Sequence, residues 1–122
     1  MVEEKKEMNN EFTPQSTEAT GPVKFATVSS TASGDTTIVA AVSGKKLRVL
    51  AFCLTAANGV NEAVKFRTAT TDITGIISLS SDNVAGPFSP VGHFETVAGE
   101  LLAINNAGAG DVTGYLVYQE IT

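Results

Sequence analysis

The sequence predicts an all-β domain, and three observations predict it. From Val23 onward, short runs rich in Val, Ile, Phe, Tyr and Thr alternate with clusters of Gly, Asp, Asn and Ser. The periodicity of an amphipathic helix is absent, and glycine recurs too often for long helices. Regularly spaced short strands with turn residues between them are typical of a sandwich or a barrel. We therefore expect about eight short antiparallel strands in a jelly-roll-like β-sandwich.

Eight segments carry the strand pattern. They are residues 24–29, 36–42, 46–55, 62–68, 73–78, 94–97, 101–105 and 112–120. Turn residues separate them, and the Asn58-Gly59 pair is the strongest of these turn signals. A long loop is expected from Ser80 to Gly92, because two prolines and two glycines interrupt it.

The N-terminal segment differs from the rest of the chain. Residues 1–22 hold five glutamates against two lysines, a net charge of −3, with few apolar residues. Such a segment cannot bury enough apolar surface to offset the entropy lost on ordering. We expect a flexible or extended acidic arm over residues 1–22 and a β-sandwich domain over 23–122. The arm is either a disordered tail or a segment that orders against a neighbouring subunit, with Phe12 as its anchor.

Apolar residues occupy both faces of the longest expected strand. Under strict alternation, one face carries Leu47, Val49, Ala51 and Cys53, and the other carries Leu50, Phe52 and Leu54. A small sandwich has one core, and leaving a second apolar face in water forfeits about 25 cal/mol per Å². We expect a homo-oligomer of closed symmetry to cover that face, with loops or the arm of the same chain as the alternative cover. The expected interface residues are Leu50, Phe52, Leu54, His93, Phe94, Leu116 and Tyr118.

Charge and hydropathy exclude two classes of partner. The formal net charge is −5 and no basic stripe is visible, so we expect no nucleic-acid partner. The densest basic cluster, around Lys45 and Lys46, is either solvated or contacts an acidic partner surface. No segment approaches the roughly 20 apolar residues of a membrane helix. The charged N-terminus is unlike a secretory signal, so we expect synthesis in the cytoplasm and no membrane partner.

Residues that carry chemistry are scarce. The chain has one histidine, His93, and one cysteine, Cys53, and neither sits in a catalytic or zinc-binding motif. We expect His93 either to bond a backbone carbonyl where a strand starts or to lie across a subunit axis. Glu95 and Glu100 flank a turn, but no sugar-binding aromatic platform accompanies them. We expect no enzyme activity, no cofactor and no metal, with a structural Ca²⁺ between turn aspartates left open.

A family resemblance appears in the order of these motifs. It is carried by residues 39–50, by Val64-Lys65-Phe66-Arg67 with Thr71-Asp72-Ile73-Thr74-Gly75, by Gly86-Pro87-Phe88 through Gly92-His93-Phe94-Glu95-Thr96, by Gly99-Glu100, and by Gly114-Tyr115-Leu116-Val117-Tyr118. This order resembles small structural proteins of tailed bacteriophages, the capsid decoration (cement) and head-fibre β-sandwich modules. The resemblance covers residues 23–122 and leaves the acidic arm outside it.

The resemblance implies a non-enzymatic virion protein. A decoration protein of this kind binds the outer capsid surface as a homotrimer and stabilises contacts between capsomers. Its partners are then other copies of itself and the major capsid protein, with Phe12, Lys45 and Lys46 as the expected capsid contacts. It is made in the host bacterial cytoplasm and ends on the virion surface. The alternative function is a receptor- or carbohydrate-binding module of a head or tail fibre, using the Ser80–Gly92 loop.

Overall fold

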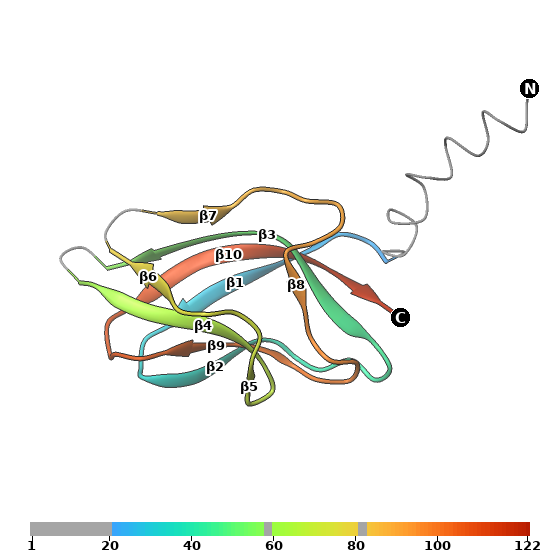
Figure 1. The fold of residues 1–122 in the computed structure, drawn as a ribbon, viewed down its shortest axis with the longest axis horizontal. Helices are drawn as coiled ribbons and strands as arrows, with labels where there is room; N and C mark the ends of the chain where they lie inside the picture. Colours follow the sequence, from blue (N-terminus) through green and yellow to red (C-terminus); the bar gives the residue numbers. More distant parts are fainter. Residues whose placement is uncertain (1–20, 58–59, 81–82) are drawn as a thin grey trace, which may run out of the picture.

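A computed structural model describes residues 21–57, 60–80 and 83–122 of the chain. These residues form two antiparallel sheets packed face to face, and none of them lies in a helix (Figure 1). The prediction of an all-β sandwich is therefore confirmed. The strands are β1 (Lys24–Ser30), β2 (Gly34–Val39), β3 (Lys46–Ala56), β4 (Glu62–Thr68), β5 (Thr71–Asp72), β6 (Ile77–Leu79), β7 (Val84–Gly86), β8 (Phe94–Glu95), β9 (Leu102–Asn106) and β10 (Val112–Ile121).

The strands divide between two five-stranded sheets. Sheet A has the order β1-β10-β3-β7, and β8 also pairs with β3. Sheet B has the order β2-β9-β4-β5, and β6 also pairs with β4. The first and last strands are neighbours in sheet A, so its pairing spans nearly the whole domain in sequence (Figure 1). The finer jelly-roll assignment stays a prediction.

Two expected elements differ from the structure. The strand expected over residues 73–78 is only partly present: β6 begins at Ile77, and residues 73–76 connect it to β5. The Thr74 hydroxyl accepts a hydrogen bond from the Phe66 backbone N–H at 3.0 Å, and the Ile73 N–H donates to the Phe66 carbonyl at 2.8 Å. These bonds hold the segment beside β4 without regular pairing. The expected Ser80–Gly92 loop contains β7, which pairs with residues 52–54 of β3.

A β-bulge in β3 accounts for the apolar residues on both of its expected faces. In the pairing with β10, Val117 lies opposite Ala51 and Tyr118 lies opposite Val49, so Leu50 is an extra residue. An extra residue switches which alternate positions face inward. Leu47 and Val49 before the bulge, and Leu54 and Ala56 after it, consequently all belong to one core.

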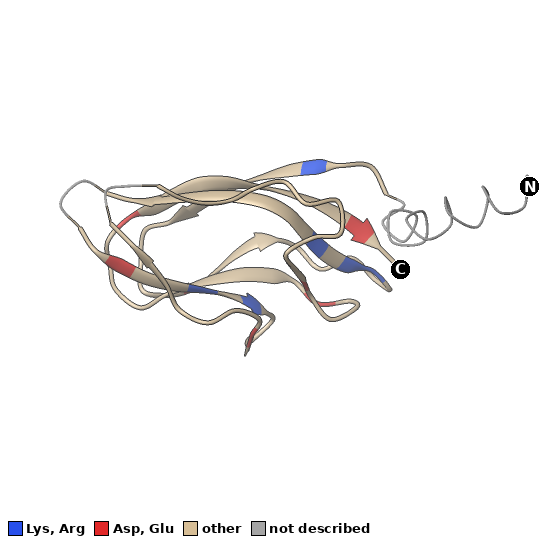
Figure 2. Cartoon of the chain, turned by 45° about the horizontal axis from the view of Figure 1, so that its top comes forward, with Lys and Arg blue, Asp and Glu red and all other residues tan. Residues whose placement is uncertain are grey.

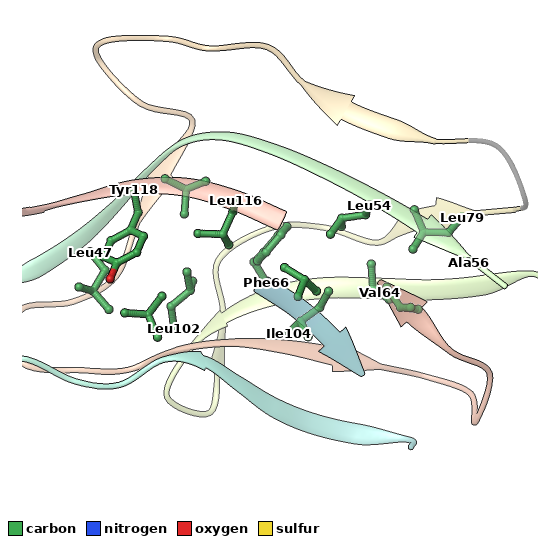
Figure 3. Packing of buried hydrophobic residues seen from close by; sticks show 14 residues of the cluster. Leu47, Leu54, Ala56, Val64, Phe66, Leu79, Leu102, Ile104, Leu116 and Tyr118 are labelled. Carbon is green, nitrogen blue, oxygen red and sulfur yellow. The ribbon is translucent and has the colours of Figure 1, made fainter. Parts of the chain in front are cut away.

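The core lies between the two sheets and is filled by aliphatic side chains with one central aromatic ring (Figure 3). Phe66 is fully buried and contacts Phe52 and Phe94 from sheet A, at ring-centroid separations of 5.5 and 4.8 Å. The remaining fully buried apolar side chains include Val28, Leu47, Val49, Leu54, Val64, Leu102, Ile104, Val112 and Leu116. Strands from both ends of the domain thus share one core.

The expected arm lies almost entirely outside the described residues. Phe12 and residues 1–20 fall outside them, so the arm's conformation stays a prediction. The described chain begins at Gly21, whose carbonyl accepts a hydrogen bond of 2.6 Å from the Gln119 side chain. The chain therefore enters the domain beside the end of β10.

Candidate interaction surfaces

The outer face of sheet A is apolar in its middle. Alternate residues of β1, β3, β7 and β10 contact the core: Ala26, Val28, Phe52, Leu54, Val84, Leu116 and Tyr118. The positions between them therefore point away from the core. One row across the strands is Phe25, Val117 and Ala51, and the next is Thr27, Tyr115, Cys53 and Ala85. Phe25 is 74% exposed and Tyr115 is 53% exposed. We call the positions Phe25, Ala51, Cys53, Ala85, Tyr115 and Val117 the sheet A patch.

Polar rows border the sheet A patch at both ends. On one side lie Ser29, Thr113 and Thr55 in register. On the other lie Gln119, Arg48 and Glu95, where Arg48 and Glu95 form an ion pair of 2.9 Å. No charged residue lies in β3, β7 or β10 between these rows, and Figure 2 shows the middle of β3 and β10 without charge.

The charges of sheet A gather at one end. Lys24 pairs with Glu120 at 2.9 Å, and Lys46 pairs with Glu95 at 3.4 Å. The hydrogen bond to Glu120 raises the pKa of Lys24. Figure 2 places the basic residues of β3 and the acidic residue of β10 near the C-terminus. These charges are paired within the chain, which leaves the patch beside them neutral.

The outer face of sheet B carries a network of charges instead. Arg67 bonds Asp72 at 2.9 Å and Asp35 at 3.1 Å, and Lys65 bonds Asp72 at 2.9 Å. The Asn105 amide also donates to Asp35 at 2.7 Å. The pKa of Arg67 is raised, mainly by its hydrogen bond to Asp35. The pKa of Asp72 is lowered, mainly by the hydrogen bond that it accepts from Lys65. The two outer faces therefore have opposite character.

Several expected interface residues are buried within the chain. Leu50, Leu54, Leu116 and Tyr118 have at most 9% of their surface exposed. For Leu50 and Leu54 the expectation rests on strict alternation along β3, which the bulge at Leu50 interrupts. Leu116 and Tyr118 lie on β10 and belong to the core. Phe52 and Phe94 are only partly buried, and they also pack against the core. The bulge therefore removes the reason for expecting a second chain over that face of β3, and the homo-oligomer itself stays a prediction.

His93 bonds a backbone carbonyl, one of the two roles expected for it. Its Nε2 lies 2.6 Å from the Pro87 carbonyl oxygen, and its ring lies 5.7 Å from that of Phe52. The His93 backbone N–H donates to the Val49 carbonyl at 2.8 Å. These contacts hold residues 87–93 along the edge of β3.

Of the expected capsid contacts, the described residues include Lys45 and Lys46. Lys46 is engaged in the ion pair with Glu95. Lys45 closes the preceding turn, where its backbone N–H donates to the Val42 carbonyl at 3.0 Å. The structure thus places the two lysines at the charged end of sheet A, next to the sheet A patch.

A buried carboxylate lies at the other end of the sandwich. Glu62 is 8% exposed, and its Oε2 accepts a hydrogen bond of 3.0 Å from the Gly110 N–H. Its Oε1 has no hydrogen-bond partner among the residues described. A shallow pocket of about 400 Å³ lies beside it, lined by Asn61, Glu62, Ala63, Ser78, Leu79 and Ser80. Sequence reasoning missed this site, because the glutamate opens an otherwise ordinary strand.

The remaining candidates for chemistry are dispersed. Glu95 pairs with Arg48, whereas Glu100 accepts a hydrogen bond of 2.7 Å from the Thr68 hydroxyl. Across residues 21–57, 60–80 and 83–122, no group of three or more His, Cys, Asp or Glu side chains is placed to hold a metal ion. The same residues include no helix long and apolar enough to span a membrane.

Comparisons with protein-family models, with curated proteins and with solved structures found no match for this chain.

Proposed function

We propose that this chain is a capsid decoration (cement) protein, a non-enzymatic virion component of a tailed bacteriophage. In this role it binds the outer capsid surface as a homotrimer and stabilises contacts between capsomers. The proposal joins the motif resemblance to the contrast between the two outer faces of the sandwich. The neutral sheet A patch is the observation that carries it, since exposed apolar patches ringed by polar residues mark protein interaction sites.

The arrangement of charges supports the same role. The acidic and basic side chains on the outer face of sheet B satisfy one another, so this face suits exposure to solvent. The sheet A patch suits contact with protein. A module that covers a shell needs one surface of each kind, and many copies on one lattice turn weak contacts into firm retention.

Imaging of purified capsids with and without this protein tests the proposal. Decoration predicts extra density on the outside of the shell, with three-fold symmetry, that disappears when the protein is omitted. Deleting residues 1–22 is expected to weaken capsid attachment while the trimer survives. The proposal is contradicted if capsids incubated with a saturating amount of the protein show no extra density on the outside of the shell, or show it inside the shell.

A second candidate is a receptor- or carbohydrate-binding module of a head or tail fibre. Residues 87–93 favour it, because Phe88 and Val91 are exposed there while hydrogen bonds to β3 hold the segment in place. An exposed aromatic ring on a fixed loop suits stacking against a sugar. Binding on a glycan array or to host cells that is lost in Phe88→Ala, together with no capsid binding, favours this function over decoration.

A further inference from the structure

We propose that Glu62 and the loop over residues 106–110 form a binding site for a hard metal cation, with Ca²⁺ as the ion that suits it best. The site lies at the end of the sandwich away from the N-terminus, where β4 begins and where β9 connects to β10 (Figure 1). It shares no residue with the sheet A patch, so the inference does not depend on the proposed function.

The Glu62 carboxylate has one oxygen that lacks a donor or a cation. The side chain is 8% exposed, and its Oε2 accepts a hydrogen bond of 3.0 Å from the Gly110 N–H. Its Oε1 has no hydrogen-bond partner among the described residues. Buried carboxylates are normally paired with a cation or coordinate a metal, because an uncompensated buried charge is costly. By contrast, an ion pair or a hydroxyl donor serves Asp35, Asp72, Glu95, Glu100 and Glu120.

Glycines bring the backbone of the loop against this carboxylate. A Cβ added at Gly108 or at Gly110 would collide with the carboxylate oxygens of Glu62. The side chain of Asn106, which is 1% exposed, fixes the loop in this position. Its Oδ1 accepts the Gly108 N–H at 3.0 Å, and its Nδ2 donates to the Gly110 carbonyl at 2.9 Å. The carboxylate therefore lies in a fixed backbone pocket, which we call the Glu62 cradle.

The groups that meet at the Glu62 cradle offer oxygen ligands. They are the Glu62 carboxylate, the Asn106 amide oxygen, the Gly110 carbonyl and the Ser30 hydroxyl, which lies 3.4 Å from Asn106 Nδ2. A carbonyl or amide oxygen that accepts one hydrogen bond keeps a second lone pair for another ligand. Carboxylate, amide and carbonyl oxygens are the ligands of Ca²⁺, which takes roughly six to eight oxygens and completes its shell with water. Zinc and copper prefer imidazole and thiolate ligands instead.

The charge at this end of the sandwich also favours a cation. In the described chain this end is formed by residues 57, 60–63, 78–80, 83 and 106–112. Their charged side chains are Glu62 and Asp111, and both are acidic. Among the coloured residues, Figure 2 shows acidic positions but no basic ones there. A cation in the Glu62 cradle therefore offsets a negative charge that no described basic side chain at this end offsets.

A single carboxylate predicts weak binding. Within the described residues, no three His, Cys, Asp or Glu side chains converge on a metal position, so most ligands have to be neutral oxygens or water. Ca²⁺ sites poor in charged ligands have dissociation constants of about 0.1–1 mM. At a Ca²⁺ concentration about ten times the dissociation constant, the unfolding equilibrium constant is expected to fall about tenfold.

Urea denaturation of the full-length chain tests the inference. The wild type and Glu62→Gln are each measured in about 10 mM CaCl₂ and in a chelator with NaCl added to the same ionic strength. The glutamine keeps an acceptor for the Gly110 N–H but removes the charge. We expect Ca²⁺ to lower the unfolding equilibrium constant of the wild type about tenfold and to leave that of Glu62→Gln unchanged. Glu100→Gln is the matched control, because it removes a partly buried carboxylate outside the cradle, and it should respond as the wild type does.

The amide resonances of Gly108 and Gly110 provide a second readout, which needs no variant to fold. Saturable shifts of both resonances with Ca²⁺ support the inference, and their absence overturns it. An equal response of the wild type and Glu62→Gln in urea overturns it as well, since the ion then acts elsewhere on this acidic chain. So does a wild type whose stability is the same in CaCl₂ and in the matched NaCl. Neither measurement involves capsids, so each outcome leaves the proposed function unaffected.

Discussion

Deletion of Leu50 is expected to prevent folding, because this residue creates the bulge that turns both halves of β3 towards one core. Val49 and Ala51 lie opposite the consecutive residues Tyr118 and Val117, which leaves Leu50 without a partner in the register. Without it, β3 alternates regularly against β10. Either Leu47 and Val49 or the residues from Phe52 onward must then turn away from the core.

The smaller of these two losses is already large. Leu47 and Val49 are both 0% exposed, and exposing two such side chains costs roughly 3–6 kcal/mol. Losing the buried Leu50 side chain adds roughly 2–5 kcal/mol. The total approaches or exceeds the roughly 5–15 kcal/mol by which domains of this size are stable.

Urea denaturation followed by circular dichroism measures the effect, with Leu50→Ala as the matched control. The alanine variant loses the same side chain but keeps the extra residue, so we expect it to fold with a lowered midpoint. The deletion variant is expected to show no cooperative transition. A deletion variant that folds with the stability of Leu50→Ala refutes the role assigned to the bulge.

Three further substitutions test single contacts. Gly114→Ala is expected to destabilise the domain by at least about 2 kcal/mol, because Gly114 has φ +152° and an added Cβ meets the Cys53 carbonyl. Gly75→Ala is the control: a Cβ there meets nothing within 4 Å, so the urea midpoint should stay unchanged. Glu62→Gln is expected to raise the free energy of unfolding by about 1 kcal/mol, since it removes a buried carboxylate whose Oε1 has no hydrogen-bond partner among the described residues. A lower free energy of unfolding contradicts this. Asp72 has a lowered pKa, so its ion pairs stabilise the fold above its ordinary value of 3.8 and this is lost as the pH falls through the lowered value. Asp72→Asn should flatten the acid side of the stability profile, and an unchanged profile argues against that role.

The sequence predicted the fold well where local pattern determines structure. The strand expected over residues 62–68 matches β4, and the long strand expected over 46–55 matches β3 to within one residue. Residues 62–68 alternate between apolar and polar, residues 46–55 form a mostly apolar run, and turn residues flank both segments. Residues 73–76 are not in the strand expected there, because their placement depends on a hydrogen bond between the Thr74 hydroxyl and the Phe66 backbone, which no local pattern encodes.

The interaction surface was harder to predict, because it depends on register. The sequence shows how many apolar residues β3 contains. The face of the sheet on which each of them lies is set by the pairing with β10, about sixty residues away. The charge network of sheet B has the same origin, since Asp35, Arg67 and Asp72 come together only through the pairing of β2, β9, β4 and β5. Composition alone therefore identified neither face.

The reason for expecting self-assembly changes once the bulge is taken into account. The apolar residues of β3 that first suggested an exposed second face are largely used in the core, and only Ala51 and Cys53 of that strand remain in the sheet A patch. The unsatisfied apolar surface lies instead on the neighbouring strands, in Phe25 of β1 and Tyr115 of β10. Exposed aromatic rings on neighbouring strands of one sheet, in a chain whose other outer face carries a network of ion pairs, are not explained by the stability of a single copy. Contact with another protein surface explains them, and the single cysteine, opposite Tyr115 on β3, makes that contact measurable.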